Sequence, residues 1–239
     1  MEMNKNKLFI SKLNLEIIDN SITGIIGNNE LFIKENFFDK DTFEEVINEK
    51  KYVISLAGER EYLTKTVSDE FFLRKKIIND NDNYIEKIMS ALEMVGLNDT
   101  YLEKNNNNLS KTEKKLINMA LALIVNPDII ILDNIVNNLD KVNKLLIKRI
   151  ILNLKNKYNK TIIILDNINI LYEMCDYFLI KKDDNILLYD SKKNIINNVD
   201  LLIENNIEIP FIIKFMHDLE NSNREIGEYK NIFDLIKSI

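Results

Sequence analysis

Two runs of mostly β-branched residues limit the fold of this chain more than any other feature. Residues 128–133 read DIIILD and residues 161–166 read TIIILD, so both runs are continuously apolar and both end in an aspartate. Strands covered on both faces have this pattern, whereas strands with one face in water alternate apolar and polar residues. The runs therefore predict two buried strands of a parallel sheet, and residues 22–27 (ITGIIG) and 52–57 (YVISLA) predict two more.

Helical patterns separate these strands. Residues 83–95 carry apolar side chains with the period of an α-helix and stop at Gly96. Residues 110–125 open with a serine and a glutamate at capping-box spacing and end before Pro127. Residues 139–157 predict a long amphipathic helix. Strands that alternate with helices in this way predict an α/β fold with a mostly parallel sheet.

One stretch departs from the alternation, because residues 66–78 and 83–95 are consecutive helical patterns with no strand between them. A helical subdomain inserted at about residues 66–126 explains this order. Two short helical patterns near the end of the sequence suit a tail or an interface element. We therefore predict a main domain at residues 1–205 and a short helical extension at residues 206–239.

The composition argues against several classes of partner and site. The formal net charge is −6, from 32 basic and 38 acidic residues, so there is no basic excess of the kind that nucleic-acid binding requires. Cys175 is the only cysteine and His217 the only histidine, which excludes an intramolecular disulfide, a thiolate metal cluster and histidine-based triads or zinc sites. We expect Cys175 to be a packing residue and His217 a surface residue.

The sequence predicts no signal peptide and no transmembrane segment. The N-terminal residues are polar, and no apolar run approaches the roughly 18 residues of a membrane span. We therefore expect an intracellular chain that is able to dock on a membrane protein.

Glycine is scarce in this sequence. The chain has five glycines, where average usage would give about 17. A loop that surrounds phosphate oxygens with bare backbone needs several glycines close together, so the scarcity limits any mechanism based on such a loop.

The order of three motifs in the middle of the chain resembles that of the ATP-binding cassette (ABC) ATPases. In that family a Leu-Ser-Gly-Gly-Gln signature opens a helix, a Walker B strand ends in aspartate and glutamate, and a Leu-Asp D-loop follows. The corresponding pieces here are LSKTE (residues 109–113), IIILDN (129–134) and NNLD (137–140). The resemblance covers nearly the whole chain and is strongest to the ATPase subunits of energy-coupling-factor transporters, whose short dimerisation region residues 206–239 resemble.

The resemblance implies a P-loop NTPase-like ABC ATPase fold that binds ATP and Mg²⁺. It also implies two partners, a homologous ABC ATPase subunit in a hetero- or homodimer and an integral membrane transporter subunit. Such a subunit is peripheral, at the cytoplasmic face of the plasma membrane. ABC ATPases work as head-to-tail pairs, in which each site combines the phosphate loop of one subunit with the signature of the other.

The phosphate loop that the resemblance implies is degenerate. Such a loop needs bare glycine backbone, a lysine for the β- and γ-phosphates and a hydroxyl for Mg²⁺. With Gly27 as the first glycine, Ile33 takes the lysine position and Lys34 lies one place late. With Gly24 as the first glycine, Glu30 takes that position. The residues of the degenerate loop in the first register are Gly27, Asn28, Asn29, Ile33 and Lys34.

The positions that carry hydrolysis in the family are substituted as well. Asn134 follows the Walker B aspartate in place of glutamate, and Asn167 lies where the family has its switch histidine. An amide cannot polarise the attacking water as a carboxylate does. Asp133 keeps two interpretations, a Mg²⁺ ligand acting through water or a cap for the segment that follows.

The signature and the D-loop keep two interpretations each. The signature residues are Leu109, Ser110, Lys111, Thr112 and Glu113, with Lys111 and Thr112 in the places of the two glycines. Ser110 either contacts the γ-phosphate of a partner-bound nucleotide or caps the helix, with Glu113 completing the capping box. Lys111 is a candidate cation for that γ-phosphate. Asp140 either bridges two subunits or caps the helix after it.

These substitutions favour a degenerate, ATPase-impaired subunit that couples a competent homologous ATPase to membrane transport. Two alternatives remain open at this point. One is an active ATP-hydrolysing ABC subunit with unusual motifs, and the other is a soluble ABC-like scaffold without a transporter.

Overall fold

The chain forms two compact units, one made of residues 1–47 and 163–239 and the other of residues 48–162. The computed structural model describes residues 7–10, 15–27, 53–57, 62–78, 83–136, 139–166, 168–182 and 185–220. Strand β6 (Thr161–Leu165) carries the chain from the second unit into the first.

The first unit is built around strand β3, whose five residues are all buried. Strand β7 pairs with β3 in parallel and with β8 in antiparallel register, so the order here is β3-β7-β8. Strands β1 and β2 form a separate antiparallel pair. The elements are β1 (Lys7–Ile10), β2 (Leu15–Ile18), β3 (Ile22–Ile26), α6 (Ile168–Met174), β7 (Tyr177–Lys182), β8 (Asn185–Ser191), the 3₁₀ helix η5 (Lys192–Asn198), α7 (Val199–Glu204) and α8 (Phe211–Glu220).

Helix α6 packs closely on β3 at Gly24. A Cβ atom at Gly24 would lie 2.9 Å from Sγ of Cys175 and 3.3 Å from Cβ of Leu171, so only a residue without a side chain allows this approach. Cys175 is buried, and desolvation raises the pKa of its thiol above the usual value. The expectation that Cys175 is a packing residue is therefore confirmed.

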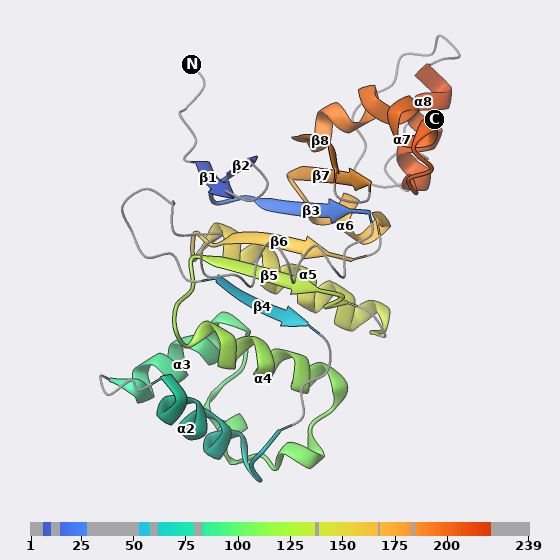
Figure 1. Cartoon of the computed structure of the whole chain (residues 1–239). Helices are drawn as coiled ribbons and strands as arrows, with labels where there is room; N and C mark the ends of the chain where they lie inside the picture. The colour runs from blue at the N-terminus through green and yellow to red at the C-terminus, as the bar shows by residue number, and fades with distance from the viewer. Residues whose placement is uncertain are drawn as a thin grey trace. The chain divides into compact units, whose positions relative to one another are not determined.

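Helices α7 and α8 follow β8 and contact each other (Figure 1). His217 of α8 has only 15% of its side chain exposed, and its Nε2 lies 3.5 Å from Oδ1 of Asp200 on α7. The expectation of a surface histidine is therefore wrong, because a sequence pattern does not show that α7 folds back on α8. The second predicted helix of the extension falls within residues 221–239, outside the described part. The boundary at residues 205 and 206 stays a prediction.

The second unit contains two parallel strands and a group of helices. Strands β4 and β5 pair in register along their whole length, from Val53 opposite Ile129 to Ala57 opposite Asp133. Helices α2, α3 and α4 gather beside β4 (Figure 1). The elements are β4 (Val53–Ala57), α2 (Val67–Ile78), α3 (Tyr84–Met94), the 3₁₀ helices η3 (Asp99–Glu103) and η4 (Asn106–Asn108), α4 (Lys111–Leu123), β5 (Ile129–Asp133) and α5 (Lys141–Asn156).

Helix α4 has the largest buried face of this group because its apolar residues follow the helical period. Each leucine or isoleucine side chain that it buries contributes about 1.5–3 kcal/mol. The described helix begins and ends within two residues of the predicted segment 110–125. Its buried residues are Leu116, Ile117, Met119, Ala120, Leu121, Ala122 and Leu123.

A polar cluster fixes the entry to α2. The buried carboxylate of Glu70 accepts hydrogen bonds from the backbone N–H groups of Leu63 and Thr64, both at 3.2 Å, and from the hydroxyl of Thr64 at 2.8 Å. The amide of Asn106 donates to the carbonyl oxygens of Thr64 and Thr66. These bonds tie the loop before α2 to η4, which lies directly before the signature residues.

Strands alternate with helices in both units, and the pairs β3–β7 and β4–β5 are parallel. The predicted α/β fold class is confirmed. Among the described residues, no helix combines the length and the apolar character that crossing a membrane would require.

Candidate functional site

The carboxyl end of β5 carries Asp133 and Asn134. Asp133 is half-buried, and Asn134 is exposed with a φ of 51°, a left-handed conformation that asparagine adopts more readily than most residues. The side-chain amide of Asn134 donates a hydrogen bond to Oδ1 of Asp133 at 2.9 Å. The pair therefore presents one carboxylate, which suits a Mg²⁺ ion bound through water, and an amide, which accepts no proton from water.

Helix α4 holds the turn after β5 in position. Nζ of Lys115 donates to the carbonyl oxygen of Ile135 at 2.8 Å, and both Ile135 and Val136 are buried. The backbone that follows Asn134 is thus anchored from the helix that begins with the signature.

Asp140 caps α5. Its Oδ1 accepts the backbone N–H of Asn143 at 2.9 Å and its Oδ2 accepts the side-chain amide of the same residue at 2.6 Å. These hydrogen bonds to the charged form lower the pKa of the Asp140 carboxyl below its usual value. The capping interpretation of Asp140 is confirmed, and bridging to a second subunit stays a prediction. Residues 137 and 138 of the D-loop lie outside the described part.

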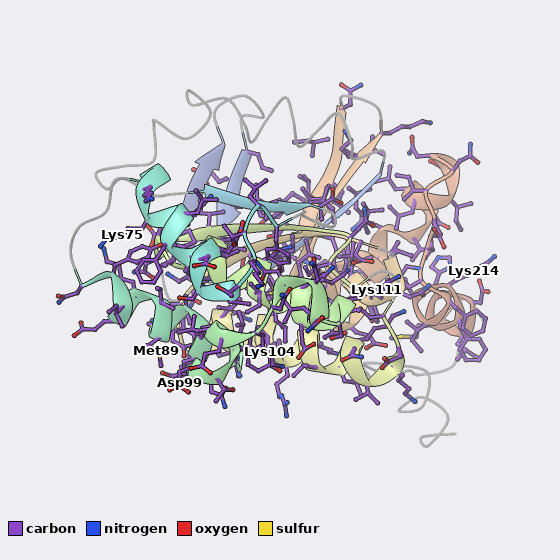
Figure 2. The ribbon with its side chains drawn as sticks, turned by 90° about the horizontal axis from the view of Figure 1, so that it is seen from below. Lys75, Met89, Asp99, Lys104, Lys111 and Lys214 are labelled. Atoms are coloured by element: carbon purple, nitrogen blue, oxygen red, sulfur yellow. The ribbon has the colours of Figure 1, made fainter. Side chains whose placement is uncertain are left out.

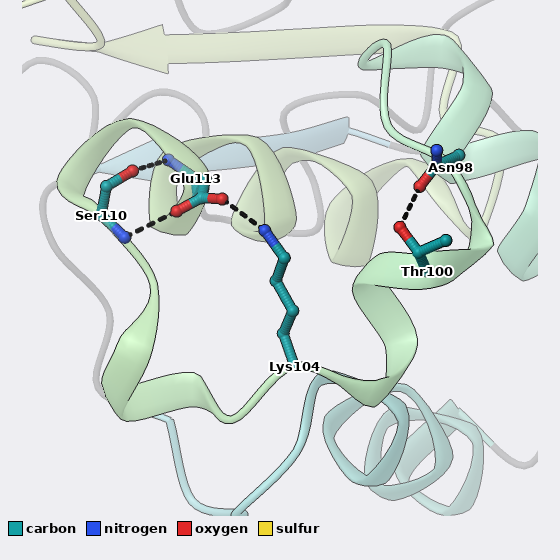
Figure 3. Close-up of polar contacts among 5 residues, drawn as sticks. All are labelled: Asn98, Thr100, Lys104, Ser110 and Glu113. Atoms are coloured by element: carbon teal, nitrogen blue, oxygen red, sulfur yellow. Dashed lines mark hydrogen bonds and ion pairs between the residues drawn. The ribbon is translucent and has the colours of Figure 1, made fainter.

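The signature residues form a closed capping box at the start of α4 (Figure 3). Oγ of Ser110 accepts the backbone N–H of Glu113 at 3.2 Å, and Oε2 of Glu113 accepts the backbone N–H of Ser110 at 2.8 Å. The capping interpretation of Ser110 and Glu113 is therefore confirmed. Contact with a nucleotide on a partner subunit stays a prediction.

Lys104 completes this arrangement, although no motif in the sequence pointed to it. Its Nζ lies 2.7 Å from Oε1 of Glu113 (Figure 3). The same Nζ lies 3.7 Å from the ring centroid of Tyr101. The ion pair with Lys104 is the main reason that the pKa of Glu113 falls to about 2, and the backbone hydrogen bond from Ser110 adds to it. The positive N-terminal end of the α4 dipole thus interacts with the carboxylate of Glu113, which belongs to the same helix.

Lys111 and Thr112 occupy the first turn of α4, where the family has glycines. Lys111 is exposed (Figure 2), Thr112 is half-buried, and Leu109 before them is buried. Both positions therefore carry side chains where the resemblance places glycines with bare backbone.

Gly27 follows β3 and has a conformation that only glycine adopts easily, with φ at 129°. A Cβ atom there would collide with the carbonyl oxygen of Lys181 and lie 2.9 Å from Cγ of the same residue. Gly27 itself is exposed. The other predicted residues of this loop, Asn28, Asn29, Ile33 and Lys34, and the switch position Asn167 lie outside the described residues.

Sequence reasoning missed Lys181. The residue is 4% exposed at the carboxyl end of β7, although a lysine after an apolar run normally marks the point where a strand reaches water. Lys181 lies against Gly27, the residue that follows the neighbouring strand β3, and the sequence pattern does not specify this pairing.

The comparisons with known proteins agree with the fold and with the resemblance to the ABC ATPases. Residues 27–137 match the family described as ABC transporter. Over 176 residues the chain is 31% identical to the energy-coupling factor transporter ATP-binding protein EcfA of Malacoplasma penetrans, covering 71% of this chain and 58% of that protein. It is 26% identical to EcfA1 of Mesomycoplasma hyopneumoniae, covering 73% and 64%. The match thus spans less than two thirds of these relatives' lengths.

Two solved structures show the same fold. The chain superposes on cbiO1 of Clostridium perfringens, described as part of the ABC transporter complex cbiONQ, with a TM-score of 0.64 and 19% identity, covering 85% of this chain and 90% of that one. It superposes on MJ1267, an ATP-binding cassette of an ABC transporter in its ADP conformation, with a TM-score of 0.62 and 18% identity, covering 83% and 96%.

Proposed function

We propose that this chain, which is related in sequence to the ABC transporter ATP-binding proteins and has the fold of their cassettes, is an ATPase-impaired subunit of an energy-coupling-factor-like transporter. In this role it pairs with a competent homologous ATPase and docks on an integral membrane subunit at the cytoplasmic face of the membrane. Closure of the pair is driven by the partner's ATP, and this chain transmits that closure to the membrane subunit.

The observation that carries the impaired hydrolysis is the pair at the end of β5. Hydrolysis needs a group that accepts or orients the proton of the attacking water, and a carboxylate after the Walker B aspartate is the family's solution. Here the side chain is the amide of Asn134, and its Nδ2 is engaged with Oδ1 of Asp133 at 2.9 Å. Asp133 still fits a role in holding Mg²⁺ beside ATP, which would supply charge compensation but no base.

The start of α4 supports the same proposal from the side of the partner's nucleotide. A signature helix acts on a phosphate through its bare N-terminal backbone. In this chain the carboxylate of Glu113 accepts the backbone N–H of Ser110, and Lys104 neutralises that carboxylate. A γ-phosphate arriving there would have to displace an internal anion of the same sign.

The partners are tested by purification from the native cell. The tagged chain is extracted in detergent, and the proteins that stay bound are identified by mass spectrometry. We expect an integral membrane protein and a second ABC ATPase whose sequence keeps the phosphate-loop lysine and the Walker B glutamate. Recovery of the chain without a membrane protein would favour the scaffold without a transporter.

The division of labour is tested in the purified complex by the rate of phosphate release from ATP. Glutamine in place of the partner's Walker B glutamate should lower the rate by about 100-fold or more, since it removes the general base. Asn134→Ala in this chain, the matched change, should leave the rate unchanged. A comparable loss from Asn134→Ala, or steady hydrolysis by this chain alone, would establish it as an active enzyme instead.

A further inference from the structure

Helix α5 carries an unusual charge for this chain. Its 16 residues include five lysines and arginines and no aspartate or glutamate, although the whole chain has a net charge of −6. Helices α2, α3 and α4 each have an acidic residue in the first turn, where the helix dipole favours a negative charge. Helix α5 instead has Lys141 and Lys144 there. These lysines do not favour the helix itself, so their position points to an interaction with something outside it.

Two large apolar side chains are exposed on the same helix. Val142 is 76% exposed and Leu145 is 56% exposed, and residues three apart lie on one face of a helix. Arg149 is exposed one turn further along that face, and Lys141 and Lys144 are exposed beside it. We call these five residues the basic face of α5. The buried residues of α5 lie on its other side and are Ile147, Ile150, Ile151 and Leu154.

The helices at the end of the described chain carry the opposite charge. Residues 199–219 contain four acidic residues and one lysine. On α7, Asp200 and Glu204 are exposed, and Ile203 is 49% exposed on the same side of the helix. The Asp200 side chain stays 80% exposed, although Nε2 of His217 lies 3.5 Å from its Oδ1. We call Asp200, Ile203 and Glu204 the acidic face of α7.

The two faces match in their chemistry. Each has an exposed branched apolar side chain among charged residues, Leu145 among cations on α5 and Ile203 among anions on α7. Opposite charges steer two surfaces together and fix their register, and the apolar side chains gain free energy when they leave water. The two faces belong to different compact units, so each is formed within its own unit.

We propose that copies of this chain associate through a contact between the basic face of α5 in one copy and the acidic face of α7 in another. Each copy carries both faces, so the same contact forms twice when two copies exchange it. The faces are small, which makes this a weak and reversible association that depends on chain concentration and on salt. It goes beyond the proposed function, because it uses no residue of the signature, of the Gly27 loop or of the end of β5.

Sedimentation equilibrium of the full chain, without nucleotide, tests the proposal by reversing the charges. One variant combines Lys144→Glu with Arg149→Glu, and a second combines Asp200→Lys with Glu204→Lys. We expect each variant alone to associate about tenfold more weakly than the wild type, because like charges then face each other. An equal mixture of the two variants should associate like the wild type, since every contact between unlike copies again joins opposite charges.

A control variant keeps both faces and changes the net charge equally. It combines Lys65→Glu with Lys76→Glu, both exposed residues outside the two faces, and should associate like the wild type. A wild type that stays monomeric up to about 200 μM would overturn the proposal. It would also be overturned if the mixture of reversed variants failed to associate, or if the wild type formed a dimer that neither reversal weakens.

Disulfide formation between copies locates the contact. Leu145→Cys and Ile203→Cys proteins are mixed and oxidised with diamide, and the native Cys175 is buried and does not compete. We expect a covalent pair that contains one copy of each protein, and little pairing when Ile85→Cys, an exposed position on α3, replaces Leu145→Cys. Equal pairing with Ile85→Cys would overturn the proposal. None of these outcomes changes the partners or the hydrolysis rate expected of the transporter complex, so the proposed function is judged separately.

Discussion

Two regions correspond to places where an ABC ATPase presents bare backbone to phosphate: the start of α4, and the carboxyl ends of β3 and β7. They differ in the side chains that now surround that backbone. At α4, Lys111 and Thr112 replace the glycines, and the carboxylate of Glu113 accepts the backbone N–H of Ser110. At β3, Gly27 is kept and packs against a buried lysine. In the first region a backbone N–H group is bound by an internal carboxylate, whereas in the second a glycine is required by the packing of Lys181.

The difference shows that two backbone segments of one fold can be constrained in different ways. An internal carboxylate and an incoming phosphate compete for the same backbone N–H groups at the start of α4. The carboxylate therefore stabilises the helix but weakens phosphate binding there. At Gly27 the packing of Lys181 leaves no room for a side chain, so a steric constraint keeps this backbone bare. The two regions therefore respond differently to the same kind of substitution.

The largest expected effect is at Gly27. Gly27→Ala should lower the free energy of unfolding by about 3 kcal/mol, because alanine at positive φ is strained and its Cβ meets the carbonyl oxygen of Lys181. Gly96→Ala is the matched control, since Gly96 also has a positive φ, 75°, but nothing lies within 4 Å of an added Cβ. That control should lose about 1 kcal/mol. Urea denaturation measures both, and equal losses would mean that the Lys181 contact yields easily.

Glu113 should give the next largest effect, and its effect should depend on pH. Glu113→Gln keeps a capping-box residue but loses the charge, so unfolding at pH 7 should become easier by about 1 kcal/mol. The pKa of Glu113 falls from 4.5 to about 2 on folding, so this contribution is present above pH 4.5 and is lost as the pH falls toward 2.

The test of this sign is urea denaturation of wild type and variant at several pH values between 7 and 3. The difference between the two proteins should stay constant from pH 7 down to about pH 5 and shrink below that, as the pH approaches the folded-state pKa of Glu113. Asp140→Asn is the control at the start of α5, because asparagine is as good a cap as aspartate and should leave the free energy of unfolding nearly unchanged. A difference that grows toward acid would contradict the depressed pKa of Glu113.

The sequence predicted what depends on local order and missed what depends on pairing. The first residues of α4 and α5 follow from the N-caps Ser110 and Asp140, because an N-cap acts within the first turn of its helix. Strand β5 follows from its continuous apolar run. Lys104 was missed because the 3₁₀ helix η4 between it and α4 sets its distance from Glu113. Lys181 was missed because the pattern of β7 does not show that the residue packs against Gly27 after the neighbouring strand β3.

The smallest expected effect is the interaction energy between Lys104 and Glu113 at the start of α4. A double-mutant cycle of Lys104→Met and Glu113→Gln should give a small favourable coupling energy, because 40% of the Lys104 side chain is exposed to water. The ion pair of Lys157 with Glu93 is the control, since both side chains are more than half exposed and their coupling should be close to zero.

The comparison of the two ion pairs determines how the α4 start resists a phosphate. Both pairs are short, at 2.7 and 3.0 Å, so distance alone does not separate them, and only the pair of Lys104 with Glu113 lies at the N-terminus of a helix. A coupling energy larger than that of Lys157 with Glu93, and lower in added salt, would mean that the charge of Lys104 holds the Glu113 carboxylate in place. Equal coupling energies in both pairs would mean that an arriving phosphate has to displace only the backbone hydrogen bond from Ser110 to Glu113. Glu113→Ala would then free the backbone N–H of Ser110 as fully as removing both Lys104 and Glu113.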